Sequence, residues 1–426
     1  MNNLSEWLVY LEQKYPQSIH FGLERVRQVA ERLKLTQTEA TVISVAGTNG
    51  KGSVVHLLEK IYTDAGYQVG SYTSPHLLHF NERFRVNTRM LPDIRLVEAF
   101  TAIEDVREEI FLSYFEVATL VALYCFKQQP LDVILMEVGM GGRLDATNII
   151  DADLSVITGI DYDHQQWLGN TLEAIAGEKA GILRPNKPLI YGDRIMYTSV
   201  MKEIERLNCP VFCRDRDFGL DESSSSFYFG KKSLSLKNGY SMQPDAVANA
   251  LMVLEYFQSL MPVASSIIQR NCERADFTGR QQLIKKERWL LLDVAHNAQS
   301  VASLAKKIKN LQQPGENVHV VFSSLSDKDQ QALIAPLAGV ANFWYISTLM
   351  CSRATDSLIL FNCIKELTGH LVLNYATMDE AFNTAWQNSN AGDLIVVYGS
   401  FYTVAAVLST ELYKKIMGET NEVFYG

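Results

Sequence analysis

Apolar runs and segments of helical period alternate along the first half of the chain. Runs rich in valine, isoleucine and leucine predict buried strands, and apolar residues that recur every three or four positions predict helices. The expected strands cover residues 42–46, 68–75, 133–138, 154–160 and 188–191. The expected helices cover residues 5–34 in two parts, a segment after residue 53, and residues 94–109, 115–128 and 171–181. This alternation predicts a mostly parallel sheet with helices on both faces.

The pattern changes after residue 215. Polar and apolar positions alternate around Gly230, which predicts a small antiparallel hairpin within residues 215–242, and a helix is expected over 246–259. A second strand-helix alternation begins at Trp289, with strands expected at residues 290–293, 318–322, 343–346 and 394–398. We therefore expect an α/β chain of two domains, a larger one over residues 1–277 and a smaller, Rossmann-like one over residues 278–426.

Length and charge narrow the choice of function. A chain of 426 residues is too long for one ordinary core, and its 47% hydrophobic and 20% charged residues are typical of globular proteins. The net charge of -9 argues against a nucleic-acid binder and against binding to an anionic membrane. The first residues lack the pattern of a signal peptide, and no apolar run has the length of a membrane span, so we expect a cytoplasmic protein. Six scattered cysteines predict reduced thiols.

The segment 42–53 predicts a phosphate-binding loop. An apolar strand breaks at Gly47, and Lys51 and Ser53 then open a helix, which is the order of elements in a nucleotide phosphate cradle. The loop departs from the Walker pattern, because Val45 stands where a glycine is usual and Gly52 separates the lysine from the hydroxyl. The alternative is a glycine-rich turn with a solvated lysine. We favour phosphate binding because loop, lysine, hydroxyl and helix all occur in the expected order.

Three polar residues follow or end the expected parallel strands, where α/β sheets bind ligands. Glu137 is the single charge in an apolar strand, so it either pairs with an arginine or holds a cation; beside a phosphate loop we favour Mg²⁺. His164 alone is more often a structural histidine than a metal ligand. Ser74, before Pro75, is of a kind that usually stabilises a turn.

Further candidates lie in the second half of the chain and at one helix end. Lys179 lies at an apolar helix end, where a lysine is most often a surface residue whose ammonium reaches solvent, and it is kept as a functional candidate. Arg280 is either a linker charge or a phosphate ligand. Asp293 and His296 end a strand and either bind a ligand or cap the next helix.

Taken together, these motifs resemble the folylpolyglutamate synthase and dihydrofolate synthase family, the folate branch of the Mur ligase fold. The motifs of the first domain that carry the resemblance are residues 47–53, 72–76, 137–148, 163–164 and 178–182. Those of the second domain are residues 293–297, 327–329 and 399–404. The resemblance implies an ATP-dependent ligase in which a pteroate or folyl carboxylate forms an acyl phosphate that the amine of L-glutamate attacks.

The resemblance also implies roles for individual residues. The nucleotide would be bound by Thr48, Asn49, Gly50, Lys51, Gly52, Ser53, Asn249, Arg280, Asp293 and His296, so that ATP bridges the two domains. Two Mg²⁺ ions would be held, directly or through water, by Ser53, Ser74, Glu137 and His164. Lys179 matches a position that is carbamylated in the family, and the catalytic set is Lys51, His164, Lys179 and Arg280.

The family's pterin-binding segments also have counterparts here. They are His20, Phe21 and Gly22; Ser113, Tyr114, Phe115 and Glu116; and Arg143, Leu144, Asp145 and Ala146. The pair Arg143 and Leu144 favours a bifunctional enzyme that uses dihydropteroate as well as reduced folates, and the alternative is a monofunctional folylpolyglutamate synthase.

Two departures from the family pattern stand out. Thr278 replaces a proline before Gly279 and Arg280, and the adenine-side asparagine has no exact counterpart, so we take Asn249. A cell-wall Mur ligase fits these motifs less well. A different class, a P-loop ATPase that switches or drives a partner without ligation, would need no pterin segments. We expect small-molecule substrates and a monomer.

Overall fold

The chain divides into two units, Met1–Ala275 and Asp276–Gly426, in a computed structural model that describes all residues except 2, 15–21, 222, 237–238 and 419–426. The expected boundary followed residue 277, and the two units meet two residues earlier. The expected α/β class is confirmed in each unit. Within the described residues, no helix has the length and apolar character needed to cross a membrane.

The first unit is built on an eight-stranded sheet of described residues with the order β4-β3-β2-β5-β1-β6-β7-β8. The six strands from β2 to β8 in this order are parallel, and β3 and β4 are antiparallel additions at one edge. Most of the parallel strands are buried along their whole length, as expected for a sheet covered on both faces. The strands are β1 (Thr41–Ala46), β2 (Val69–Tyr72), β3 (Phe84–Val86), β4 (Arg89–Met90), β5 (Val133–Glu137), β6 (Leu154–Ile157), β7 (Leu189–Tyr191) and β8 (Val211–Cys213).

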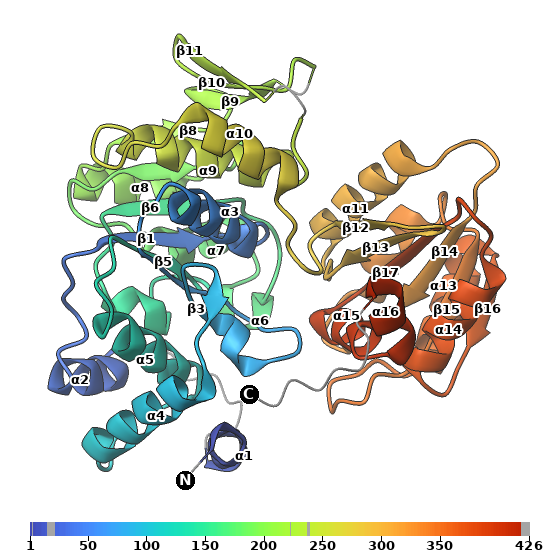
Figure 1. Ribbon diagram of the computed structural model, residues 1–426, viewed down its shortest axis with the longest axis horizontal. Helices are drawn as coiled ribbons and strands as arrows, with labels where there is room; N and C mark the ends of the chain where they lie inside the picture. Colours follow the sequence, from blue (N-terminus) through green and yellow to red (C-terminus); the bar gives the residue numbers. More distant parts are fainter. Residues whose placement is uncertain (2, 15–21, 222, 237–238, 419–426) are drawn as a thin grey trace. The chain divides into compact units, whose positions relative to one another are not determined.

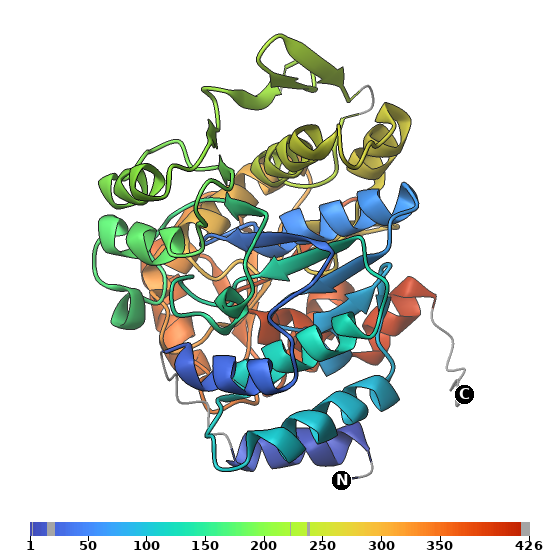
Figure 2. The same cartoon turned by 90° about the vertical axis from the view of Figure 1, so that its left-hand side faces the viewer.

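Helices cover both faces of this sheet (Figures 1 and 2). One face carries α3 (Lys51–Asp64), α9 (Pro244–Phe257) and α10 (Ser265–Arg274), and both α9 and α10 pack on α3. The opposite face carries α1 (Leu4–Lys14), α2 (Glu24–Arg32), α4 (Asp93–Arg107) and α5 (Tyr114–Lys127), whose apolar sides share one core. The remaining helical segments are η1 (Phe80–Arg83), η2 (Ala146–Ile149), α6 (Gln165–Leu168), α7 (Leu172–Ala180) and α8 (Thr198–Leu207).

The expected hairpin is instead a separate sheet of three described strands, β9 (Phe218–Asp221), β10 (Ser226–Phe229) and β11 (Lys232–Ser235). Strand β9 and its pairing with β10 were not anticipated, because the polar serine run that follows β9 obscures its apolar pattern. The two strands also depend on Gly219, since a Cβ there would overlap the Tyr228 ring that lies across from it. This small sheet packs on α9 rather than extending the main sheet.

The second unit has a six-stranded sheet of described residues with the order β12-β13-β17-β14-β15-β16, in which β12 alone is antiparallel. The strands are β12 (Gln282–Lys285), β13 (Trp289–Asp293), β14 (Val318–Phe322), β15 (Phe343–Ile346), β16 (Leu371–Asn374) and β17 (Leu394–Tyr398). The helical segments are α11 (Ala298–Leu311), α12 (Gln330–Ile334), η3 (Ala335–Leu337), α13 (Ser357–Thr368), α14 (Met378–Asn388), α15 (Phe401–Leu408) and α16 (Glu411–Met417). Strands β12 and β16 were not anticipated, since edge strands show only a weak apolar pattern.

Candidate active site

The parallel strand order places the candidate residues of the first unit side by side. The carboxyl ends of β2, β5, β1, β6 and β7 follow one another along one edge of the sheet. Ser74 follows β2, Glu137 ends β5, and the loop after β1 begins at Gly47. Chain segments far apart in sequence therefore meet at the edge where α/β sheets bind ligands.

The loop after β1 is held in one conformation by the neighbouring strand end. Gly47 has φ +146°, and a Cβ there would overlap Thr158 Oγ1, so only glycine fits. The Thr158 hydroxyl donates to Asn49 O at 2.6 Å, and Thr48 N donates to Gly159 O at 2.7 Å. Thr158 was not among the expected site residues. It follows β6 as a small polar residue, and strand-end position was the signal that could have found it.

The loop ends in the N-terminus of α3. Gly50 is the N-cap in the left-handed region with φ +85°, and Lys51 and Ser53 lie in the first turn. Lys51 Nζ donates to Gly47 O at 3.0 Å and to Thr48 O at 3.1 Å, so the ammonium folds back over the loop. The helix N-terminus and this ammonium both favour a bound anion, which makes the arrangement a phosphate cradle.

Ser74 and Glu137 are in direct contact across neighbouring strands. Ser74 N donates to Glu137 Oε2 at 3.0 Å, and the Glu137 side chain is buried at 3% exposure. Ser53 is also buried, at the start of α3 after β1, the strand next to β5. A search of the described residues finds no group of three or more His, Cys, Asp or Glu side chains that could hold a metal ion. A cation here would therefore need hydroxyl, phosphate and water oxygens besides Glu137, which is the ligand set that Mg²⁺ accepts.

His164 lies on the loop between β6 and α6. It is the N-cap of α6 in the left-handed region with φ 51°, and its side chain is 40% exposed. Its Nε2 lies 3.8 Å from Asp163 Oδ2, and its backbone N–H donates to Asp163 Oδ1 at 2.9 Å. The ring is therefore accessible to a ligand, unlike the ring of a histidine buried in a core.

Lys179 is buried, at 3% exposure, near the end of α7, and so is not a surface lysine. Burial and the positive charge of Lys51 lower the pKa of its ammonium to about 7, while the carboxylates of Asp163 and Asp145 act in the opposite direction. These interactions place Lys179 among the phosphate loop, the His164 loop and the glycine turn. A lysine with such a pKa is neutral in a large fraction of molecules at neutral pH and is a nucleophile.

The glycine turn after β5 holds its two charged residues differently. Arg143 is an exposed side chain whose Nη2 donates to Glu178 Oε1 at 2.8 Å. Asp145 is buried, caps η2, and accepts hydrogen bonds from Thr147 Oγ1 at 2.6 Å and from Met140 N at 2.8 Å. Burial raises the pKa of Asp145 despite these bonds. Leu144 is half-buried and Ala146 is buried in η2. Arg143 is thus the side chain of this turn that is most open to a substrate.

The segment before α5 has a structural role that was not anticipated. Ser113 and Glu116 form a capping box in which Ser113 N donates to Glu116 Oε2 at 2.6 Å. Glu116 is also buried and paired with Arg25 Nη2 at 3.2 Å. Capping therefore accounts for both residues without a substrate.

The two aromatic residues between them face the neighbouring loops. A Cβ at Gly139 would overlap the Phe115 ring, so this segment and the glycine turn pack together. The Arg83 guanidinium lies 5.7 Å from the Tyr114 ring centroid. His20 and Phe21 lie outside the described residues, and Gly22 has φ +132° at the start of the segment that leads to α2.

Asn249 is fully buried in α9, at 0% exposure. Neither atom of its amide has a hydrogen-bond partner in the described part of the chain. Gly192, which follows β7, allows this close approach, because a Cβ there would overlap the amide. The side chain lies close to the Thr158 carbonyl at the same position. It therefore lies near Thr158, the residue whose hydroxyl holds the phosphate loop. An unpaired buried amide is costly unless a ligand or water satisfies it.

In the second unit, three expected residues gather around Phe401 and the end of β13. The Arg280 guanidinium lies 4.8 Å from the Phe401 ring centroid, and the His296 ring lies 6.2 Å from it. Burial raises the pKa of Asp293 to about 7, although the positive charge of Arg280 opposes this. Asp293 Oδ2 is buried, with no hydrogen-bond partner among the described residues. Neither Asp293 nor His296 caps α11.

The cap of α11 is Asn297, whose side chain accepts from Ser300 N at 3.0 Å. Phe401 belongs to the segment 399–404 that carried the family resemblance, but no role was expected for it. A cation over an aromatic ring is its clearest function here.

The chain matches two family models, Mur ligase middle domain over residues 45–229 and Mur ligase, glutamate ligase domain over residues 279–401. The fold and the phosphate loop thus define an enzyme of the Mur ligase class. Curated relatives are the dihydrofolate synthase/folylpolyglutamate synthases of Haemophilus influenzae, 37% identical over 94% of this chain and 96% of that protein, and of Escherichia coli, 38% identical over 95% and 94%. The chain belongs to the dihydrofolate synthase/folylpolyglutamate synthase family.

Solved structures agree with this assignment. E. coli FolC in complex with DHPP and ADP has a TM-score of 0.90 and 36% identity, covering 97% of this chain and 98% of that one. The bifunctional enzyme of Yersinia pestis complexed with AMPPNP and Mn has a TM-score of 0.89 and 37% identity, covering 96% and 97%. The family resemblance expected from the motifs is therefore confirmed.

Proposed function

We propose that this chain uses ATP to join L-glutamate to dihydropteroate and, in a second activity, to reduced folates. The observation that carries the proposal is the meeting of a phosphate cradle, a buried carboxylate and a buried lysine of low pKa at one sheet edge. Membership of the family supplies the substrate class. The arrangement accounts for a reaction that activates a carboxylate with phosphate.

The reaction has two bond-forming steps. A carboxylate oxygen of the pteroyl or folyl substrate attacks the γ-phosphorus of ATP, the bond from that phosphorus to the bridging oxygen breaks, and ADP leaves. The α-amine of L-glutamate then attacks the acyl carbon, an amide bond forms, the amine loses a proton, and phosphate leaves. Lys51 and the N-terminus of α3 lie where they would neutralise charge on the transferred phosphate.

The candidate metal residues fit a hard divalent cation. Ser53, Ser74, Glu137 and His164 offer oxygen and imidazole ligands around the phosphate loop, and bound Mg²⁺ would supply charge neutralisation on the phosphates. We propose two such ions. The contact between Ser74 and Glu137 supports a shared role, because it fixes the carboxylate at the strand end.

We further propose that Lys179 is carbamylated. Its neutral amine would add to CO₂ to give a carbamate and release one proton. Carbamylation would change the charge of the Lys179 side chain from positive to negative. The Lys51 ammonium, which repels the protonated amine, would then attract the carbamate. Asp163 and Asp145 oppose the new negative charge, so a bound cation must offset them.

The nucleotide contacts proposed from the family pattern differ in accessibility. The loop backbone would bind the nucleotide at Thr48, Asn49, Gly50 and Gly52. Asn249 would bind it through its unpaired amide, but this side chain is fully buried, so the nucleotide can reach it only if the residues that cover it move. In the second unit, Arg280, Asp293 and His296 are proposed as further contacts. The unpaired Oδ2 of Asp293 supports a ligand hydroxyl as its partner.

The test measures glutamate-dependent phosphate release from ATP with dihydropteroate and, separately, with a reduced folate. Turnover of both substrates is expected. Turnover of the folate alone would show a monofunctional folylpolyglutamate synthase. Phosphate release at the full rate without glutamate would instead favour an ATPase that performs no ligation.

A further inference from the structure

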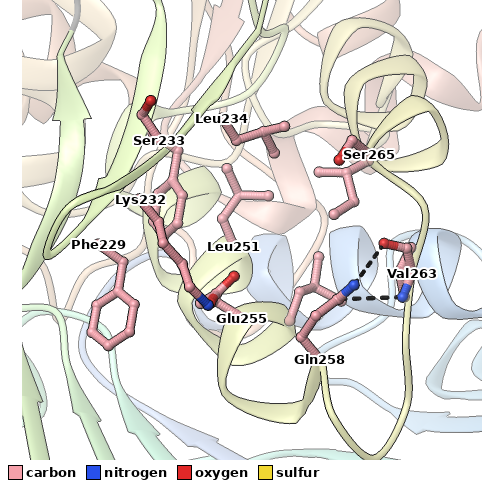
Figure 3. A pocket seen from close by; sticks show the side chains of 12 residues that line it. Phe229, Lys232, Ser233, Leu234, Leu251, Glu255, Gln258, Val263 and Ser265 are labelled. Carbon is pink, nitrogen blue, oxygen red and sulfur yellow. Dashed lines mark hydrogen bonds and ion pairs between the residues drawn. The ribbon is translucent and has the colours of Figure 1, made fainter.

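A pocket of about 360 Å³ lies in the first unit between the three-stranded sheet and the helices α9 and α10 (Figure 3). Its inner wall is apolar and comes from β10, β11 and both helices. The apolar residues that line the pocket are Phe227, Phe229, Leu234, Leu251, Leu254, Val263 and Ile268. The volume is in the range of small-molecule sites, and the residues proposed for ligation do not line it.

The pocket contains a single ion pair. Lys232 Nζ contacts Glu255 Oε1, and these are the two charged side chains of the lining, which the structure describes in full (Figure 3). The Lys232 side chain is 72% exposed and that of Glu255 is 22% exposed. Because the Lys232 ammonium is exposed, breaking its ion pair costs little free energy. The more buried Glu255 carboxylate is stable only when a cation lies next to it. A ligand carboxylate would instead be repelled by Glu255.

We propose that this pocket binds a small amphipathic cation, a ring or branched hydrocarbon that carries one ammonium or amidinium group. The cationic group replaces Lys232 as the partner of Glu255. The hydrocarbon packs against the wall formed by the buried side chains of Phe227, Leu251 and Leu254. Phe229, the cross-strand partner of Lys232, also lines the pocket and offers an aromatic ring, a kind of surface that favours a cation.

The pocket lies on helices that also pack against the helix of the phosphate loop. At about 100° per residue, Leu251, Leu254, Glu255 and Gln258 lie on the side of α9 opposite to Asn249. Helices α9 and α10 both pack on α3, and Asn271 Nδ2 of α10 donates to Asp64 Oδ2 at the end of α3, at 2.9 Å. We infer from this packing that a ligand in the pocket shifts α9 and α10 against α3 and so changes the affinity for nucleotide without blocking its site, an inference that rests on the proposed function.

The first experiment measures binding of 2-phenylethylamine to the full chain by calorimetry and by ligand-observed NMR. The matched anion, 3-phenylpropionate, should not bind. Glu255→Gln should weaken the amine by about tenfold or more, as for loss of a charge-assisted hydrogen bond, and Lys232→Ala should strengthen it. Glu203→Gln is the control, because it removes a carboxylate from another exposed ion pair of the same unit. Equal binding of amine and acid, or unchanged binding to Glu255→Gln, would overturn the site.

The second experiment measures the dissociation constant of ADP with and without saturating amine. The amine should change it by about fivefold or more, and ADP must change the amine's constant by the same factor. Identical ADP constants would overturn the coupling, and mutual exclusion would show that the amine occupies the nucleotide site. Failure of ADP to bind at all would count against the proposed function, while the amine titration would still decide the pocket.

Discussion

The low pKa of Lys179 predicts a carbamate whose formation depends on pH. With the ordinary pKa of 10.5, a lysine is neutral in about 0.03% of molecules at pH 7, whereas with a pKa of about 7 it is neutral in about half of them. Burial and Lys51 thus increase the reactive amine by about a thousandfold. We expect carbamylation of Lys179 to rise between pH 6 and pH 8 and then to level off.

The assay equilibrates the protein with ¹³C-bicarbonate, ADP and Mg²⁺ across this pH range and quantifies the carbamate carbon by NMR. Lys187 is the internal control, because it is half-exposed and Asp153 raises its pKa. A signal that persists in Lys179→Met, or one that first appears above pH 9, would refute the reasoning. Lys179→Ala should abolish ligation and regain part of it in formate or acetate, which would occupy the position of the missing carbamate.

The same pKa has a consequence for stability. The unfolded chain holds this proton up to pH 10.5, and the folded chain releases it near pH 7. The unfolded state therefore binds more protons between these values, so the free energy of unfolding rises with pH, by about 5 kcal/mol in total. Denaturant unfolding of the wild type and Lys179→Met, both without CO₂, measures this slope. Equal slopes would contradict it.

Three further predictions concern other parts of the chain. Gly47→Ala should abolish ADP binding in calorimetry, because its Cβ overlaps Thr158 and a backbone φ of +146° is strained for any residue with a side chain; unchanged ADP binding would contradict this. Arg143→Ala should lower kcat/KM for dihydropteroate by about tenfold or more, while Glu178→Ala, which removes its partner, should have a smaller effect. Burial lowers the pKa of His319, so its contribution to stability is complete above pH 6.5 and is lost as pH falls; His319→Gln should flatten this acid limb in urea titrations.

Strand ends were the part of the site most open to prediction from sequence. A parallel sheet must bring the carboxyl ends of its strands to one edge, so Ser74 and Glu137 could be expected at the same edge from the sequence alone. Their contact required the strand order, in which β2 lies next to β5. The burial of Lys179 could not be predicted from sequence, because a lysine at an apolar helix end has the same local sequence pattern whether it faces solvent or the core. Its burial beside Lys51 depends on packing between α7 and the loops.

Other features have no local signal at all. The three-stranded sheet depends on Gly219 lying across from Tyr228, a long-range pairing that no short segment reveals. The burial of Asn249 depends on the missing side chain of Gly192 in a distant loop. By contrast, Thr158 had a signal in its position at a strand end, which the expected strand over residues 154–160 concealed, and its hydroxyl holds the phosphate loop.

The capping box before α5 bears on how this enzyme could become resistant to inhibitors. Glu116 closes the first turn of a buried helix and pairs with Arg25, so a substitution that weakened an inhibitor's contact with it would also weaken the fold. Arg143 is exposed, and its side chain pairs with Glu178 at the surface, where replacement costs little stability. A mutation of Arg143 could weaken a compound that relies on it without unfolding the protein, but the same mutation would lower activity on dihydropteroate, whereas a compound anchored on the Ser113–Glu116 turn could be evaded only at a cost in stability.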